Sequence, residues 1–283
     1  MAPAKWKPFP YRSESYALAG ATLRTAWPEL HRGDREPFPD IAFVKAALVK
    51  HPTLRGTLDA KEMAAALQSA WRAYHSGDFA GAVVEGEALG LMGANVANKA
   101  ANIYATYLET DSQSRQAIFL EAAKRAEALQ AAAPDFPNAF YFHAQALGRY
   151  SQEISVVKAL AQGIASRVRA SLDTAVRLAP DHAEAHIALG AYHAEIVNKV
   201  GVLLASLTYG ASKDAALKHF ALARKLLPRS AILRIEEANA LVLLFGKDKL
   251  SEAEKLYREA AACAPEDAMQ KLDQEHARAE AAR

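Results

Sequence analysis

Three histidines in one short segment are the residues best suited to metal chemistry. His182, His186 and His193 are separated by four and then seven positions, which places them on one face of a helix beside Glu184 and Glu195. Zinc accepts histidine and carboxylate ligands. In the zinc-protease motif, however, glutamate directly follows the first histidine, and here Ala183 stands in that position. We therefore predict no metal site and expect these histidines to pack between helices.

The remaining candidates for catalysis are equally weak. Cys263 is the only cysteine, which excludes a disulfide framework and any zinc site of several cysteines. It lies near a predicted helix end, without the adjacent positive charge that would lower the pKa of a nucleophilic thiol. The sequence contains no glycine-rich phosphate loop, nucleophile elbow or dinucleotide fingerprint. We predict no catalytic residues, no cofactor and no enzymatic activity.

The amino-acid composition predicts the fold class of the structure that carries these residues. Alanine, the best helix former, accounts for 64 of the 283 residues, against 14 glycines and 12 prolines. This composition predicts an all-α protein. The 34 basic and 32 acidic residues nearly balance, so a nucleic-acid partner held by bulk charge is not expected.

The N-terminal part differs from the remainder. Residues 1–56 contain seven of the twelve prolines. Helices are predicted from Ser15 to Trp27 and from Asp40 to Lys50, with Asp40 as the N-cap of the second. We interpret residues 1–56 as an irregular, proline-rich helical arm and residues 57–283 as a helical repeat domain.

The repeat is visible in the prolines that follow helical segments, at Pro134, Pro180, Pro228 and Pro265. Small and large residues recur at similar distances before each proline, which is the pattern of the tetratricopeptide repeat (TPR). It predicts an α-solenoid of about four TPR-like helix–turn–helix units, closed by a C-terminal capping helix. Within each unit a small residue is expected where the two helices approach most closely, at Ala144, Gly190 and Ala238.

Two insertions enlarge this repeat. Successive prolines lie 46, 48 and 37 residues apart instead of 34. The extra residues predict two extended helices, one continuous over Ile154–Leu178 and one running on past Glu195 to Leu204, with Ser212 as the next N-cap. These extensions should project side by side and either pack on each other or present an apolar patch to a ligand or partner. Their apolar residues include Val157, Leu160, Ile164, Val200, Leu203 and Leu204.

A peptide-binding groove is expected along the first helices of the units. It would be mixed aromatic and aliphatic, with amide side chains able to bond a peptide backbone. Arg149 is its only basic residue, so no clamp for a terminal carboxylate is predicted, and the arm or a neighbouring helix is an alternative occupant. The predicted groove residues are Asn98, Asn102, Asn138, Tyr141, Phe142, Gln145, Arg149, Glu184, Ile187, Ile235 and Asn239.

Three segments carry a closer resemblance: Glu121–Leu129, Pro134–Ala144 and Lys218–Ala223. They resemble the TPR-like domain of the regulator of microtubule dynamics family, and the first two also resemble the TPR-type T component of periplasmic substrate-capture (TRAP) transporters. The resemblance implies an α-solenoid that binds other proteins. For the transporter relatives it also implies oligomers and apolar ligands. It supplies no catalytic residues.

The function predicted from these features is a non-enzymatic protein–protein interaction module, an adaptor or scaffold that uses the inner groove. The alternative is an accessory protein that binds an apolar small molecule, with a homo-oligomer as a further option. A metal-dependent enzyme is the least favoured reading. The N-terminal residues lack the apolar run of a secretory signal, and no apolar stretch has the length of a membrane span, so a cytoplasmic protein is expected.

Overall fold

The computed structural model describes residues 6–282, and every regular element in that range is a helix. The all-α prediction is therefore confirmed for that part of the chain. Its contacts define two compact units. The first contains the described residues up to His31 and Arg35–Ile154, and the second contains Arg32–Asp34 and the described residues from Ser155 on. The predicted division after residue 56 is a different one and stays a prediction.

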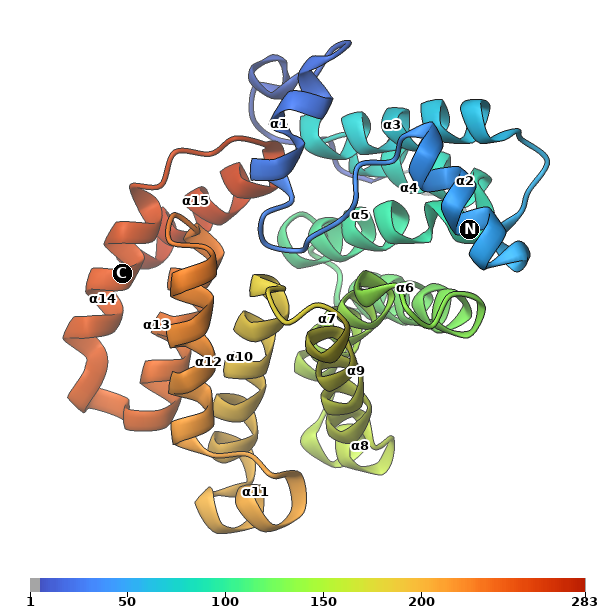
Figure 1. The fold of residues 1–283 in the computed structure, drawn as a ribbon. Helices are drawn as coiled ribbons and strands as arrows, with labels where there is room; N and C mark the ends of the chain where they lie inside the picture. The colour runs from blue at the N-terminus through green and yellow to red at the C-terminus, as the bar shows by residue number, and fades with distance from the viewer. Residues whose placement is uncertain (1–5, 283) are drawn as a thin grey trace. The chain divides into compact units, whose positions relative to one another are not determined.

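In the first unit, α3 and α4 form one helical hairpin and α5 and α6 form the next, while α7 packs on α5 and α6 (Figure 1). The helices of this unit are α1 (Thr22–Leu30), α2 (Ile41–Lys50), α3 (Ala60–Ser76), α4 (Phe79–Ala88), α5 (Ala94–Tyr107), α6 (Ser112–Ala132) and α7 (Pro137–Gln152), with 3-10 turns at Ser13–Tyr16, Pro52–Leu54 and Gly90–Gly93.

Local sequence explains where these helices begin and end. Gly77 takes a left-handed conformation (φ 93°) that ends α3, and Asp78 caps α4 by accepting from the Gly81 amide. The predicted cap at Asp40 is confirmed, because its carboxylate accepts from the Phe43 amide. The predicted helix from Ser15 to Trp27 is wrong, because Gly20 (φ 53°) precedes α1 and the helix forms only after it.

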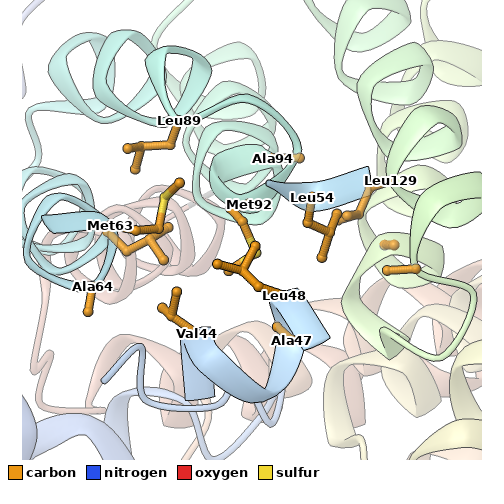
Figure 2. Close-up of a cluster of buried hydrophobic side chains, with 13 residues drawn as sticks. Val44, Ala47, Leu48, Leu54, Met63, Ala64, Leu89, Met92, Ala94 and Leu129 are labelled. Atoms are coloured by element: carbon orange, nitrogen blue, oxygen red, sulfur yellow. The ribbon is translucent and has the colours of Figure 1, made fainter. Parts of the chain in front are cut away.

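The proline-rich arm contributes to the core of the first unit. Val44 and Leu48 of α2 are buried against Met63 of α3, and Figure 2 shows their side chains pointing toward Met92 and Met63. Leu54, in the turn after α2, is buried in the same cluster. The second arm helix is therefore an integral part of the packing, because burying these aliphatic side chains stabilises both α2 and α3.

In the second unit, α10, α12 and α13 pack side by side, α14 pairs with α13, and α15 covers α14 (Figure 1). The helices of this unit are α8 (Val156–Ala161), α9 (Ile164–Leu178), α10 (Ala183–Val200), α11 (Val202–Tyr209), α12 (Lys213–Leu226), α13 (Ala231–Phe245), α14 (Leu250–Ala261) and α15 (Ala268–Ala281), with a 3-10 turn at Gly246–Lys249.

The two insertions form separate short helices. The prediction of one continuous helix over Ile154–Leu178 is wrong, because Gly163 is left-handed (φ 62°) and separates α8 from α9. The helix past Glu195 likewise ends at Val200, because Gly201 (φ 80°) turns the chain into α11. Ser212 does cap the next helix, as predicted, by accepting from the Ala215 amide.

Candidate functional site

The first unit presents a row of three helices, α3, α5 and α7, in which α5 contacts both neighbours. Asn95, Asn98 and Asn102 follow one another along α5 at spacings of three and four residues. This spacing places them on one stripe of the helix, and all three are buried. A buried amide must find hydrogen-bond partners, so the partners show what this stripe does.

Two of these asparagines join helices to one another. Arg125 of α6 donates to the Asn98 side-chain oxygen at 2.7 Å. Asn102 donates to the side-chain oxygen of Gln145 on α7 at 2.9 Å, and to the Phe142 carbonyl at 3.3 Å. Asn98 and Asn102 therefore act as polar links within the helix packing.

The third asparagine binds a segment of the arm. The Asn95 amide donates to the Glu36 carboxylate at 3.0 Å, and Asn138 at the start of α7 donates to the same carboxylate oxygen at 2.5 Å. Glu36 belongs to the connection between α1 and α2, which forms no helix or strand and passes beside α5 in Figure 1. Two neutral amides thus hold one carboxylate.

Other side chains hold the backbone of this connection. Trp27 donates its indole N–H to the Glu36 carbonyl at 2.7 Å, and Gln68 of α3 donates to the Pro39 carbonyl at 3.0 Å. We call Gln68, Asn95 and Asn138, together with the helices that carry them, the asparagine face. The connection lies on this face as an extended peptide.

Phe38 lies between two prolines in this peptide, and prolines favour extended backbone. Its ring lies edge-on to Trp27 with centroids 5.1 Å apart. The Arg24 guanidinium lies 4.3 Å from the ring centroid, within the range of a cation–π contact. Arg24 also pairs with Asp40 at 2.9 Å. Phe38 is thereby in contact with both Trp27 and Arg24.

A small cavity lies beneath the peptide. Its walls include Glu36, Pro39, Trp71 and Asn95, and it has room for a water molecule but not for an organic ligand. The Asn95 side-chain oxygen is buried without a hydrogen-bond partner, which suits a bound water. Amides and one carboxylate can recognise a peptide but do not form a nucleophile–base pair.

The structure buries most of the groove residues predicted in the first unit. Asn98, Asn102, Asn138, Tyr141 and Phe142 are buried, while Gln145 and Arg149 are half-buried. The sequence analysis did not include Gln68 or Asn95. It also did not include Glu36, whose carboxylate accepts hydrogen bonds from Asn95 and Asn138. The spacing of Asn95 from Asn98 and Asn102 was a signal that could have included Asn95. The groove assignment stays a prediction.

The groove residues predicted in the second unit fall into different surroundings. Ile187 is buried, and Ile235 packs in a small core cluster with Ala260 of α14 and Ala277 of α15. Asn239 accepts from the Tyr257 hydroxyl. Glu184 is half-buried, and its backbone N–H donates to the Gly33 carbonyl within the same unit at 3.0 Å. Ile187 and Ile235 are therefore buried, whereas Glu184 and Asn239 are half-buried, and their assignment to a groove stays a prediction.

Three histidines of the second unit, His186, His193 and His219, stack in a column in which the first two are buried and His219 is half-buried. His182 caps α10, whereas His186 and His193 lie against His219 of α12. His186 donates through Nε2 to the Pro180 carbonyl at 3.0 Å, and its Nδ1 lies 3.0 Å from the His219 Nδ1, so one of these two nitrogens donates to the other.

Burial makes His193 and His219 hard to protonate. It lowers the pKa of His193 to about 4, with Arg169 adding to the effect, and burial and the neighbouring His186 lower the pKa of His219 to about 4. Residues 6–282 contain no group of three His, Cys, Asp or Glu side chains placed to hold a metal ion. Burial also raises the pKa of the Cys263 thiol, which opposes thiolate formation.

The two insertions expose aliphatic side chains. Val157, Leu160, Leu203 and Leu204 are exposed. Ile164 was predicted to belong to the projecting extension, but it is buried, because the turn at Gly163 directs it into the packing of α9. Val200 is half-buried. The seven exposed aliphatic residues of α8 and α11 are Val156, Val157, Leu160, Val202, Leu203, Leu204 and Leu207.

Comparison with known proteins supports the fold. No protein-family model matches the chain, and no curated protein matches it. A solved structure of a thermophilic TPR protein from Thermus thermophilus is similar, with a TM-score of 0.55 and 16% sequence identity over 77% of this chain and 99% of that chain. The TPR-like helical-repeat fold predicted from the sequence is thereby confirmed. The resemblance to the two named families stays a prediction.

Proposed function

We propose that this chain is a protein-interaction module whose first unit binds an extended peptide on the asparagine face. The observation that carries the proposal is the grip of Asn95 and Asn138 on the Glu36 carboxylate. TPR-like folds generally serve as protein-interaction modules, and helical-repeat proteins use extended surfaces of this kind for binding. The segment of the chain's own arm is thus a model for the partner.

The contacts define the chemistry of that partner. The peptide needs a carboxylate for the two asparagines and a backbone carbonyl for Gln68. It also needs an aromatic side chain beside Arg24, as Phe38 provides. We infer a partner segment in which an acidic residue precedes a proline and an aromatic residue.

The chain's own segment competes with such a partner. A tethered ligand has an effective concentration of roughly millimolar order, so an external peptide meets an occupied face. A partner gains access when it binds more tightly than the segment or when the segment is weakened. The proposal places the chain among adaptors with protein or peptide partners, with no catalytic step and in the cytoplasm.

The test is binding of a labelled peptide with the sequence of residues 34–41, followed by fluorescence anisotropy. In the full chain, Glu36→Ala combined with Phe38→Ala weakens the internal segment while leaving the asparagine face intact. We expect this variant to bind the peptide at least about tenfold more tightly than the unsubstituted chain, because the internal competitor is lost. A peptide with glutamine in place of the glutamate should bind more weakly.

Glu121→Gln is the matched control, because Glu121 is an exposed carboxylate on α6. It should leave peptide binding unchanged. Glu36→Gln alone provides a second route, since it weakens the grip of Asn95 and Asn138 on the internal segment and leaves Arg24 in place for the aromatic residue of the external peptide. Equal, weak peptide binding by the unsubstituted chain and both folded variants would reject the proposal.

The apolar small-molecule alternative receives no support from the cavity under the arm, which is limited to a water molecule. Its strongest remaining basis is the set of exposed aliphatic side chains on α8 and α11.

A further inference from the structure

A second extended segment lies on the first unit, at residues 6–11. Its sequence, Trp-Lys-Pro-Phe-Pro-Tyr, contains the motif Pro-Phe-Pro, which occurs again at residues 37–39 in the peptide on the asparagine face. Proline fixes φ at about −65°, and the residue before a proline favours extended backbone. Residues 6–11 accordingly form no helix or strand.

The two aromatic residues of this segment share one side of it. The polyproline II helix that prolines favour has three residues per turn, so Trp6 and Phe9 point in the same direction. The burial agrees with this spacing, because Trp6 and Phe9 are half-buried, whereas Lys7, Pro8 and Pro10 are exposed. The segment therefore presents an aromatic edge to the unit and leaves its other side in solvent.

The first anchor, Trp6, is held at the C-terminal end of α5. Its ring stacks on Tyr104, with centroids 3.9 Å apart and planes 6° apart. The Lys7 backbone N–H donates to the Tyr104 hydroxyl at 3.2 Å, and Lys7 Nζ donates to the Thr110 hydroxyl at 2.7 Å. The Tyr104 hydroxyl itself donates to the Glu109 carboxylate at 3.2 Å. These contacts recognise an aromatic side chain and the residue that follows it.

The second anchor, Phe9, lies where the turn between α3 and α4 carries no side chain. A β-carbon on Gly77 would lie 2.6 Å from the Phe9 Cγ atom. The Phe9 ring is edge-on to Phe79 of α4, with centroids 6.4 Å apart, and Phe79 is buried in the unit. We call the surface formed by Gly77, Phe79, Tyr104 and Thr110 the aromatic face.

The aromatic face is separate from the asparagine face. Tyr104 lies nine positions after Asn95 on α5, which corresponds to about 14 Å along the helix axis. The bound segments also differ in the residues before their shared motif. Arg35 stands three positions before Phe38, where the first segment has Trp6 before Phe9. Each face therefore matches a different Pro-Phe-Pro segment.

We infer that the aromatic face is a second peptide-binding site, whose partner is a proline-rich segment with two aromatic residues three positions apart. Proline-rich segments dock on aromatic surfaces with little loss of entropy, because their unbound backbone is already close to the bound conformation. Residues 6–11 occupy the site as an internal ligand. The chain after them is anchored separately, since Arg72 of α3 donates to the Leu18 carbonyl at 2.9 Å.

The experiment is binding of a labelled peptide with the sequence of residues 6–11, followed by fluorescence anisotropy. In the full chain, Trp6→Ala combined with Phe9→Ala removes both internal anchors and leaves the aromatic face intact. We expect this variant to bind the peptide at least about tenfold more tightly than the unsubstituted chain, because the internal ligand no longer competes. Trp6→Ala alone should give a smaller gain, in a chain where Phe9 still packs against Gly77.

Altered peptides test the chemistry that is recognised. Alanine in place of the peptide's tryptophan should weaken binding to the double variant at least about tenfold, because a buried aromatic anchor is lost. Alanine in place of both prolines should also weaken it, because the free peptide then loses its preference for the extended conformation.

The variant Glu36→Ala, Phe38→Ala is the matched control, because it weakens the segment on the asparagine face and leaves residues 6–11 in place. It should bind the 6–11 peptide as weakly as the unsubstituted chain does, and the Trp6→Ala, Phe9→Ala variant should show no gain for the 34–41 peptide. Equal binding of the 6–11 peptide by the unsubstituted chain and the folded Trp6 variants would overturn the inference, as would an equal gain for the 34–41 peptide. The crossed design separates a failure of the aromatic face from a failure of the asparagine face.

Discussion

Gly190 of α10 faces the ring of Phe220 on α12 so closely that a β-carbon on Gly190 would lie 2.7 Å from the Phe220 Cε2 atom. Both residues are buried. The TPR pattern predicts a small residue at this position because the two helices approach closely there, and the structure confirms that close approach. The contact fixes how α10 packs on α12, the pair that carries the histidine column.

Replacing Gly190 should therefore destabilise the protein. Gly190→Leu introduces a side chain where even a β-carbon overlaps the Phe220 ring, and overpacking of a close helix contact costs about 1–3 kcal/mol. We expect a lower denaturant midpoint at an unchanged slope. Gly148→Ala on α7 is the control, because a β-carbon there meets no atom within 4 Å. A midpoint unaltered by Gly190→Leu would contradict the predicted packing.

Gly93 should be still less tolerant of a side chain. A β-carbon on Gly93 would lie 2.1 Å from the Gly86 carbonyl oxygen, which belongs to the backbone of α4 and cannot rotate away. Gly93→Ala should cost about 2 kcal/mol or more in the free energy of unfolding, because the start of α5 must move away from α4. Thermal or denaturant unfolding measures it. Gly148→Ala again serves as the reference, and equal stabilities of the two alanine variants would refute this prediction.

The arm helix α2 should contribute to stability through Leu48. Leu48 is 8% exposed and packs in the core cluster of the first unit, whereas its neighbour Val49 is 79% exposed. Leu48→Ala should destabilise by about 2–5 kcal/mol, because it removes buried methyl groups and leaves a cavity. Val49→Ala should change the free energy of unfolding by less than about 0.5 kcal/mol. Equal, small effects would show that α2 is only loosely attached.

Stability should decrease as the pH falls from about 6.5 towards 4, because the unfolded chain binds protons that the folded chain excludes. The pKa of both His193 and His219 is about 4 in the folded protein, against 6.5 for an ordinary histidine. The unfolded state therefore holds more protons in this range, and each pKa unit corresponds to about 1.4 kcal/mol.

Chemical denaturation at several pH values measures this loss. The double variant His193→Gln, His219→Gln should show a flatter profile between pH 6.5 and 4.5, even if it is less stable at neutral pH. Carboxylates with a lowered pKa, such as Asp40 and Asp111, act mainly below this window. A variant as steeply pH-dependent as the unsubstituted chain would assign the effect to other groups.

The asparagines show where sequence reasoning reached its limit. Asn98, Asn102 and Asn138 were predicted to line a groove, and the structure buries all three in contacts with other parts of the first unit. A side-chain amide is equally suited to a peptide and to a neighbouring helix. The choice depends on which partners the fold brings near, and Asn138 meets Glu36 across 102 positions of sequence.

The sequence by itself determined the helical class, the caps at Asp40 and Ser212, and the need for a small residue at Gly190. Each depends on residues a few positions apart or on a repeated spacing, and local backbone chemistry is enough to decide it. Only the tertiary structure decided that the segment around Glu36 lies on the asparagine face and that α11 stays exposed. Burial is a property of the assembled surfaces, so it depends on contacts between residues that are distant in the chain.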